Sequence, residues 1–298
     1  MQTTDAAVSQ PQTLSLLGFR TQTQVTAPNG MVFHCVDHRE IEGMYREIFE
    51  ENVYGTNGIT FHEGMTVFDV GANVGMFATY ANHRCPSAKI FCFEPIPPTF
   101  KALEKNVKEH NIKNAKLFNM GVSDKPGSAD FTFYVYSAGW STMHKHETPD
   151  FMKVVRSDIR SYDRLPKVLQ LAFKTPILGS LLIELIVHFK MKSKTFHCQL
   201  KTLSDVMKEN KVDKIDLLKV DVERAEYAVL SGISDADWKR VGQCIIETQD
   251  DMDPQNTAKI TALLKKHGFD VLEVRAKYLI KEDGKSFNAT LYATRKAN

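Results

Sequence analysis

The sequence predicts an α/β fold in which a mostly parallel sheet carries helices on both faces and is interrupted by a helical insert. Short apolar runs alternate with amphipathic stretches from residue 66 onward, as in chains built of strand–helix–strand units. The first of these runs stops at Gly71, in a glycine-containing turn before a helical stretch. At 298 residues the chain can form one large domain with an extension or a lid to spare.

The N-terminal region divides into an arm and a cover. Residues 1–24 are rich in Gln and Thr and lack apolar periodicity, so we expect a flexible arm there. The Pro28-Asn29-Gly30 sequence indicates a turn, and the apolar spacing over 39–52 indicates a helix. Residues 25–64 are therefore predicted to form a hairpin and a helix that cover the ligand cleft.

The core is predicted to span residues 65–298. It begins with strands at 66–70, 89–93 and 116–120, separated by helices at 74–83 and 97–110. An additional strand is expected at 129–136. The second half continues with strands at 215–221 and 243–247, a helix at 257–267, and two late strands at 270–275 and 287–294 that close the sheet as a hairpin.

Residues at about 145–195 do not follow the alternation, and we interpret them as a helical insert. Prolines punctuate the insert at Pro149, Pro166 and Pro176, which predicts two or three short helices. A polar line with four-residue spacing follows at Ser180, Glu184 and His188. A lid over the ligand site, a dimer contact and a docking surface all fit this insert, as does plain helical packing.

Composition excludes several classes of function. The net charge is +2 and basic residues are scattered, so nucleic acid is not an expected partner. Residues 190–201, the most basic stretch, are expected to be a solvated face or a loop. The five cysteines form an odd set without a C-x-x-C pair, which argues against a disulfide framework and a structural zinc site. A reducing, cytoplasmic compartment is therefore expected.

Hydropathy gives no sign of a membrane protein. The N-terminus has no basic start followed by an apolar segment, so no signal peptide is expected. The longest apolar run, 177–189, has 13 residues and contains Glu184 and His188. A spanning helix needs about 20 residues, so no membrane span is predicted.

The turn after the first core strand reads Asp69-x-Gly71-x-Asn73-x-Gly75. Glycines there allow positive backbone angles, and amides at the start of the next helix point into the ligand space. A dinucleotide fingerprint has another glycine spacing, and an acid beside the turn repels phosphates but suits the cationic groups of S-adenosylmethionine. Glu94 ends the next strand 19 residues beyond Gly75 and suits the ribose hydroxyls. S-adenosylmethionine therefore fits better than NAD, although glycine turns are common in α/β proteins.

Five segments resemble the FkbM-type S-adenosylmethionine-dependent O-methyltransferases. They are Val67 to Gly75, Phe93-Glu94-Pro95, Gly121 to Asp124, Leu218 to Glu223, and Ile245-Ile246-Glu247. The resemblance covers residues 40–294 in order, apart from the insert. It implies a Rossmann-like class I methyltransferase fold with a seven-stranded sheet. The stretches Trp140 to Met143 and Leu203 to Val206 look most like family members from polyketide pathways.

Two positions depart from the family pattern. Arg224 stands where the family often has glycine, so that a charged side chain can reach toward the acceptor. Gln249 stands where many members have histidine, which removes one candidate for the base.

Cofactor-binding residues are expected at the carboxyl edge of the sheet. Asp124 can accept a hydrogen bond from the adenine amine and Ser123 can meet the ring, although both also suit an ordinary turn. The full predicted set is Tyr54, Asp69, Gly71, Asn73, Gly75, Glu94, Ser123, Asp124 and Asp221.

The predicted catalytic residues are three acids and one histidine. Asp221 and Glu223 point the same way if the chain is extended there, but they also suit the first turn of a helix. Glu247 ends the next strand. His144 is preferred to His146 because it lies closer to a Ser-Thr pair, although a loop histidine is more often on the surface.

Acids also gather at Glu247, Asp250, Asp251 and Asp253, a set that could hold Mg²⁺ or Ca²⁺. A solvated loop before Pro254 explains them equally well, so no metal is predicted.

The preferred function is S-adenosylmethionine-dependent O-methylation of a hydroxyl on a polyketide-type natural-product intermediate, either free or tethered to a carrier protein. A sugar or glycan hydroxyl is the alternative acceptor. A non-catalytic cofactor-binding module stays open because of Gln249, and a dehydrogenase is disfavoured by the glycine spacing. A homodimer through the insert is a further expectation.

Overall fold

The computed structural model describes residues 24–134, 143, 175–250, 253–275 and 288–295. At its centre is a seven-stranded sheet with the order β11-β12-β10-β9-β3-β4-β5. Five neighbouring strands run parallel and β12 runs antiparallel to both β10 and β11, so the predicted mostly parallel sheet is confirmed. The strands are β3 (Thr66–Val70), β4 (Lys89–Phe93), β5 (Ala115–Phe118), β9 (Ile215–Val220), β10 (Val241–Gln249), β11 (Phe269–Arg275) and β12 (Asn288–Arg295).

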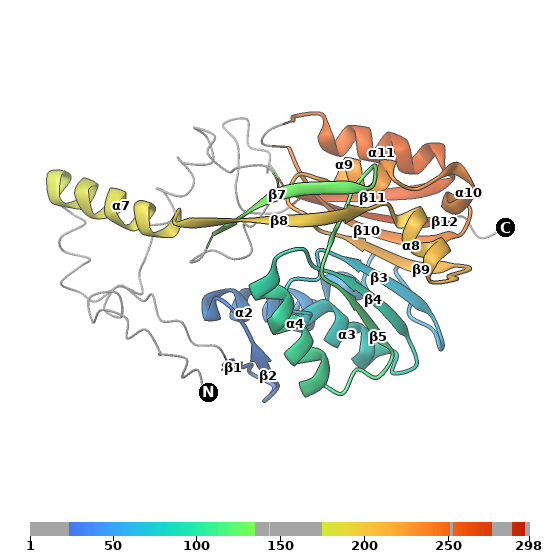
Figure 1. The fold of residues 1–298 in the computed structure, drawn as a ribbon, viewed down its shortest axis with the longest axis horizontal. Coiled ribbons are helices and arrows are strands. Elements are labelled where there is room, and N and C mark those ends of the chain that lie inside the picture. The colour runs from blue at the N-terminus through green and yellow to red at the C-terminus, as the bar shows by residue number, and fades with distance from the viewer. Residues whose placement is uncertain (1–23, 135–142, 144–174, 251–252, 276–287, 296–298) are drawn as a thin grey trace, which may run out of the picture.

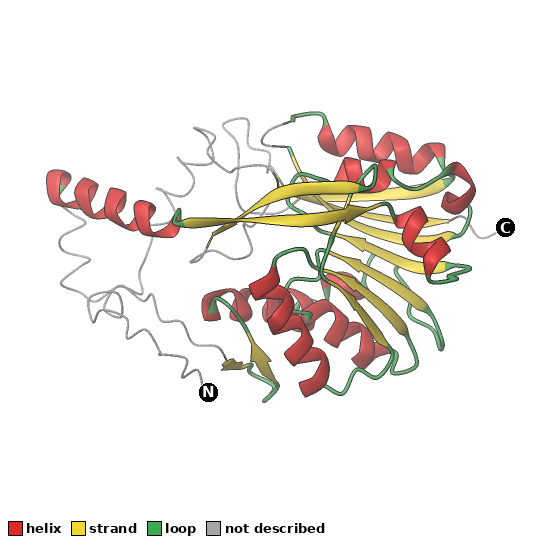
Figure 2. Cartoon of the chain, in the orientation of Figure 1, coloured by secondary structure: helices red, strands yellow, loops and turns green. Residues whose placement is uncertain are grey.

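Helices cover both faces of this sheet (Figure 2). Successive residues of β3 show why: Val67 packs into the apolar cluster on one face and Phe68 into the cluster on the other, because side chains alternate along a strand. The first cluster includes α3 (Met76–Arg84) and α4 (Pro97–Glu109). The second includes residues of α8 (Leu203–Glu209), α9 (Glu226–Ser231), α10 (Asp235–Trp238) and α11 (Asn256–Lys266).

The N-terminal segment forms the expected hairpin and helix. Strands β1 (Gln24–Thr26) and β2 (Val32–His34) pair antiparallel, and α2 (His38–Tyr45) continues into a π-helical turn, η1 (Arg46–Glu50). A short 3₁₀ turn, η2 (Val53–Gly55), follows. The side chain of Asn106 on α4 binds the segment to the core: it accepts from His34 N at 2.7 Å and donates to His34 O at 2.8 Å and Val74 O at 2.7 Å.

A second, three-stranded sheet has the order β6-β8-β7, from β6 (Gly121–Val122), β7 (Gly127–Tyr134) and β8 (Ser193–Lys201). Strand β7 is the additional strand that the sequence predicted. Of the two expectations for residues 190–201, the loop was wrong, because Ser193 to Leu200 pair with β7 as a strand, whereas the solvated face was right, because most of that strand is exposed. The strand has no apolar run because its exposed positions carry polar residues, namely Ser193, Lys194, Thr195, His197 and Gln199. Cys198 packs with Phe131 and Phe133.

The β7–β8 ribbon extends from the body of the molecule and leads to α7 (Pro176–Lys190) (Figure 1). Within the insert, this helix is the part that the structure describes most fully. Pro176 begins α7, and its polar line at Ser180, Glu184 and His188 is exposed beside Ile177 and Leu181. Pro149 and Pro166 lie outside the described residues, as does the predicted arm. Within the described ranges, each helix is too short or too polar to cross a bilayer.

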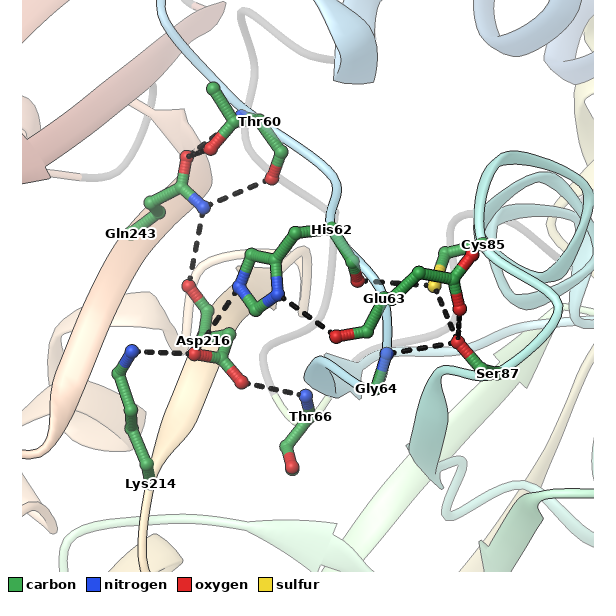
Figure 3. Close-up of polar contacts among 10 residues, drawn as sticks. All are labelled: Thr60, His62, Glu63, Gly64, Thr66, Cys85, Ser87, Lys214, Asp216 and Gln243. Carbon is green, nitrogen blue, oxygen red and sulfur yellow. Dashed lines mark hydrogen bonds and ion pairs between the residues drawn. The ribbon is translucent and has the colours of Figure 1, made fainter.

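At the amino ends of the strands, polar contacts fix the segment that enters β3 (Figure 3). Asp216 at the start of β9 accepts from Thr66 N at 2.8 Å, and the His62 ring lies 3.5 Å from the same carboxylate. Gln243 on β10 both accepts from Thr60 N at 2.8 Å and donates to Thr60 O at 3.1 Å. These contacts set the position of β3, whose other end opens onto the site described next.

Candidate active site

The chain reverses its direction across the sheet between β3 and β9. From β3 it runs outward through β4 and β5, and it then returns to place β9 on the other side of β3. Ligands of open α/β sheets bind at such a switch point, beyond the carboxyl ends of the strands. Gly71 and Asp221 are the first residues after these two strands, and Asp221 N donates to Val70 O at 3.0 Å.

The glycine turn is required by its own geometry. Gly71 has φ +78° and Gly75 has φ +83°, and Asn73 between them also has a positive φ of +48°. A Cβ atom on Gly71 would lie 1.7 Å from Asp221 O, so only glycine allows the two strand ends to approach this closely. Gly71 N and Ala72 N both donate to Phe93 O, which fixes the turn to the end of β4.

Glu94 lies just beyond β4 and forms part of the wall of a pocket of about 100 Å³. Its buried carboxylate accepts from Asn73 N at 3.1 Å and from Ile96 N at 2.9 Å. Burial raises the pKa of Glu94 to about 7, although both backbone hydrogen bonds oppose the rise. The pocket is also lined by Gly71, Asn73, Ile96, Met120, Val122, Asp221 and Glu223.

Sequence reasoning missed Lys219, which lies at the centre of the site. Its Nζ is 3.3 Å from Asp69 and 3.3 Å from Asp221, and it donates to Gly71 O at 2.9 Å. Asp69 is fully buried and is not one of the pocket-lining residues, so the cation that it faces in the structure is Lys219. A lysine inside the otherwise apolar stretch of β9 was the signal that could have revealed this partner.

Tyr54 and Glu247 form a second pair of functional groups at the same edge. The Tyr54 hydroxyl, from η2, donates to the Glu247 carboxylate at the end of β10. Ile246 pairs with Val220 in register, so Glu247 and Asp221 end neighbouring strands. Burial first, and then the charges of Asp221 and Glu47, raise the pKa of Glu247 to about 8.

The expected extended chain over Asp221 and Glu223 was wrong. Strand β9 ends at Val220, and Glu223 and Arg224 have positive φ angles of 50° and 76°. Both acids nevertheless line the same pocket, because the turn brings Glu223 back toward it. Burial raises the pKa of Glu223 well above its ordinary value, with further repulsion from Asp221.

The two positions that depart from the family pattern contact each other. Arg224 N donates to Gln249 Oε1 at 3.0 Å and to Glu226 Oε1 at 2.7 Å. Gln249 therefore supplies an acceptor that holds the turn after β9 in its left-handed conformation. This contact gives Gln249 a structural role in place of the histidine of other members.

The remaining predicted residues lie farther from the pocket or outside the described ranges. Ser123 is buried, with its amide bonded to Lys201 O, while Asp124 is exposed; neither is a pocket-lining residue. His144 is outside the described residues. In the acidic loop, Asp250 binds Arg275 and Asp253 binds Lys259. Among the described residues no group of three potential ligands could hold a metal ion, and Asp251 lies outside them.

Comparison with known proteins places this site in a family. The sequence pattern of the methyltransferase FkbM domain matches residues 69–271. The chain belongs to the FkbM methyltransferase family. It is 33% identical over 245 residues to the 31-O-demethyl-FK506 methyltransferase FkbM of Streptomyces tacrolimicus, covering 82% of this chain and 88% of that protein. S-adenosyl-L-methionine is the cofactor of this chain.

Other relatives differ in length and origin. AMB antimetabolite synthetase AmbE of Pseudomonas aeruginosa is 33% identical to this chain over 251 residues, but this chain spans only 11% of that protein. Methyltransferase 1 of Beauveria bassiana is 29% identical, covering 78% of this chain and 82% of that protein. A precorrin-6y C5,15-methyltransferase structure from Geobacter metallireducens aligns over 79% of this chain and 82% of its own at 12% identity, with a TM-score of 0.38.

The residues of the crevice fit the cofactor. The buried Asn73 Oδ1 has no hydrogen-bond partner among the described residues. Such an atom can accept a hydrogen bond from a ligand, which would remove the cost of leaving it unpaired. The carboxylates of Glu94 and Asp221 in the pocket wall suit the hydroxyl and cationic groups of the cofactor.

Proposed function

We propose that this FkbM methyltransferase transfers a methyl group to a hydroxyl of a polyketide-type natural-product intermediate. The observation that carries the proposal is the Glu247 carboxylate, held by Tyr54 beside Asp221 at the carboxyl edge of the sheet. A relative named for 31-O-demethyl-FK506 supports an oxygen acceptor. The match to a much longer synthetase keeps a carrier-tethered acceptor within the proposal.

The proposed roles follow the geometry of the crevice. Glu94 accepts hydrogen bonds from the ribose hydroxyls, and the turn from Gly71 to Gly75 receives the amino-acid end of the cofactor with Asn73 Oδ1 as an acceptor. Asp69 acts indirectly, by holding Lys219 against Gly71 O and Asp221. The bound cofactor supplies an electrophilic methyl group on a sulfonium.

Glu247 is the proposed proton acceptor. With the cofactor bound, Glu247 would take the proton of the acceptor hydroxyl as its oxygen gains the methyl group, and the carbon–sulfur electron pair would stay on the sulfur. Tyr54 orients that carboxylate through its hydrogen bond. Asp221 and Glu223 line the donor pocket, and we assign them to electrostatic stabilisation of its cationic ligand.

A Glu247→Gln variant tests this assignment, with Glu104→Gln on the exposed face of α4 as the matched control. We expect Glu247→Gln to keep measurable S-adenosylmethionine binding, weakened by the loss of one neighbouring carboxylate, and to lose transfer about 10²-fold or more, the range of a removed general base. Calorimetry measures the first quantity, and labelled-methyl incorporation into a panel of hydroxylated polyketides measures the second. Normal transfer by Glu247→Gln would remove Glu247 from the mechanism, whereas donor binding without transfer by the wild-type protein would favour a non-catalytic module.

The same proposal includes a cytoplasmic enzyme without a nucleic-acid partner. The five cysteines are buried thiols outside any disulfide, which fits a reducing compartment. A homodimer through α7 stays a prediction, which light scattering of the purified chain would test.

A further inference from the structure

A second cavity, of about 630 Å³, opens beside the donor pocket and shares no lining residue with it. It lies between the N-terminal segment and the ends of β10, β11 and β12. Its volume falls in the range of about 300–1,000 Å³ that is typical of small-molecule sites. Its wall includes Gly43, Glu47, Glu51, Glu247 and Arg275.

The walls of the two cavities include residues that are neighbours on adjacent strands. Glu247 lines the second cavity and Asp221 lines the donor pocket. Ile246 pairs with Val220 in the parallel register, so the next residues, Glu247 and Asp221, lie side by side at the carboxyl edge of the sheet. Methyl transfer requires donor and acceptor to come to near contact, so an acceptor in the second cavity would meet a donor from the first at this boundary.

The charges on the cavity wall indicate which ligands it accepts. Three carboxylates line it, from Glu47, Glu51 and Glu247. Both arginines on the wall already have acidic partners: Arg275 lies 2.8 Å from Asp250, and Arg46 lies 3.7 Å from Glu42. The wall therefore offers mainly hydrogen-bond acceptors. Burial and the charge of Asp221 raise the pKa of both Glu47 and Glu247, so their negative charge grows as pH rises.

Apolar and amide surface completes the cavity. Val53, Val274 and Tyr292 contribute apolar area, while Asn288 and Thr290 add neutral polar groups. A ligand that fits such a wall donates hydrogen bonds through hydroxyl groups, has some apolar surface and carries no negative charge.

We propose that this cavity is the acceptor site and that it takes neutral molecules with several hydroxyl groups while rejecting carboxylates and phosphates. The proposal rests on the methyltransferase function proposed above, and it names the substrate class of that site. The acceptor hydroxyl lies next to Glu247, and Glu47 and Glu51 bind neighbouring hydroxyls and repel anions.

Filling the cavity tests its role. Gly43 lies on the exposed side of α2 and lines the cavity, and a Cβ added there meets nothing within 4 Å, so Gly43→Trp is the variant chosen to fill the cavity. Gly127→Trp is the matched control, since Gly127 is equally open but lies on β7, away from the cavity. We expect both variants to bind S-adenosylmethionine like wild type.

The probes are methyl β-D-glucopyranoside, its 6-carboxylate analogue, and the hydroxylated macrolactone erythronolide B, titrated with S-adenosylhomocysteine present. At least one neutral probe should bind wild type and Gly127→Trp about tenfold or more tightly than the carboxylate, and Gly43→Trp should abolish that binding. Glu51→Gln should reduce the ratio of the affinity for the neutral sugar to the affinity for its carboxylate analogue.

Three results overturn the proposal: unchanged probe binding by Gly43→Trp, equal or tighter binding of the carboxylate, or no neutral probe bound by a protein that binds the donor. Failure of the wild-type protein to bind S-adenosylmethionine would instead refute the proposed function itself. Which neutral probe binds more tightly distinguishes a sugar-type from a polyketide-type acceptor.

Discussion

Gly71→Ala is the substitution for which the structure makes the strongest demand. The alanine Cβ would lie 1.7 Å from the carbonyl oxygen of Asp221, a backbone atom, and the residue would hold φ at +78°. Contacts below 3.0 Å are essentially never seen for real Cβ atoms. The end of β9 must therefore move by more than about 1 Å, or the turn must open, and a shift of that size can reduce function about 10²-fold.

Two other glycines separate the causes of this effect. Gly30 has φ +85° but open space around it, so Gly30→Ala measures the left-handed strain alone, about 1–2 kcal/mol. Gly127 is open and has no positive φ, so Gly127→Ala should change the unfolding free energy by less than about 1 kcal/mol. Gly71→Ala combines strain with a backbone clash, and we expect a loss of about 3 kcal/mol or more.

Urea unfolding measures these free energies, and calorimetric titration with S-adenosylmethionine measures the affinity. We expect Gly71→Ala to lose about 100-fold or more in affinity while both control variants bind normally. The reasoning is refuted if Gly71→Ala is no less stable than Gly30→Ala and binds the donor as wild type does, because the close approach of β3 and β9 would then not matter.

Two further predictions concern buried charge. Burial raises the pKa of Glu94 from 4.5 to about 7, so the folded state binds this proton more tightly than the unfolded state does. The protonated carboxyl therefore contributes stability that is full below pH 4.5 and is lost as pH rises toward 7. The loss in unfolding free energy is on the order of 3 kcal/mol. The unfolding free energy of Glu94→Gln should therefore decline less than that of wild type between pH 5 and 8, and parallel curves would contradict the assignment. Lys219→Met leaves Asp69 buried without its cation and should cost about 3–5 kcal/mol in urea unfolding. Adding Asp69→Asn should restore part of that loss, and strictly additive losses would mean that the pair does not interact.

The sequence predicted those parts of the fold in which local pattern and tertiary environment agree. The strand at 66–70 and the strand at 89–93 were predicted with the bounds that the structure gives, because both are buried apolar runs bounded by turn residues. Strand β8 was missed because its pairing with β7 is a long-range interaction, and because polar residues alternate with Phe196 and Cys198 so that no apolar run forms. The helix predicted over 39–52 ends as α2 at Tyr45 and continues as a π-helical turn, a change that periodicity does not reveal.

In the site, sequence spacing identified the strand ends but not the partners. Glu94 and Glu247 were selected because each follows a parallel strand, and both lie at the carboxyl edge. Asp69 was assigned to the ligand because its motif places it beside the glycine turn. Its pairing with Lys219 depends on the register of β3 against β9, where Asp69 and Lys219 are directly opposite, and no local pattern specifies that register.

This pairing determines the charge that the ligand meets. Lys219 is shared between Asp69 and Asp221, and its charge opposes the rise in pKa that burial and neighbouring acids impose on Glu47 and Glu247. After burial, repulsion from Asp221 raises the pKa of both glutamates. A cationic donor bound beside Asp221 must therefore lower the pKa of Glu247. By reciprocity, the protein must bind that donor more tightly when Glu247 is ionised. In the proposed reaction the sulfonium charge disappears at the step in which Glu247 gains a proton. Loss of the neighbouring cation would restore the raised pKa of Glu247, so the carboxylate would become a stronger base as the proton reaches it. The same coupling predicts that affinity rises with pH more steeply for S-adenosylmethionine than for its uncharged thioether product.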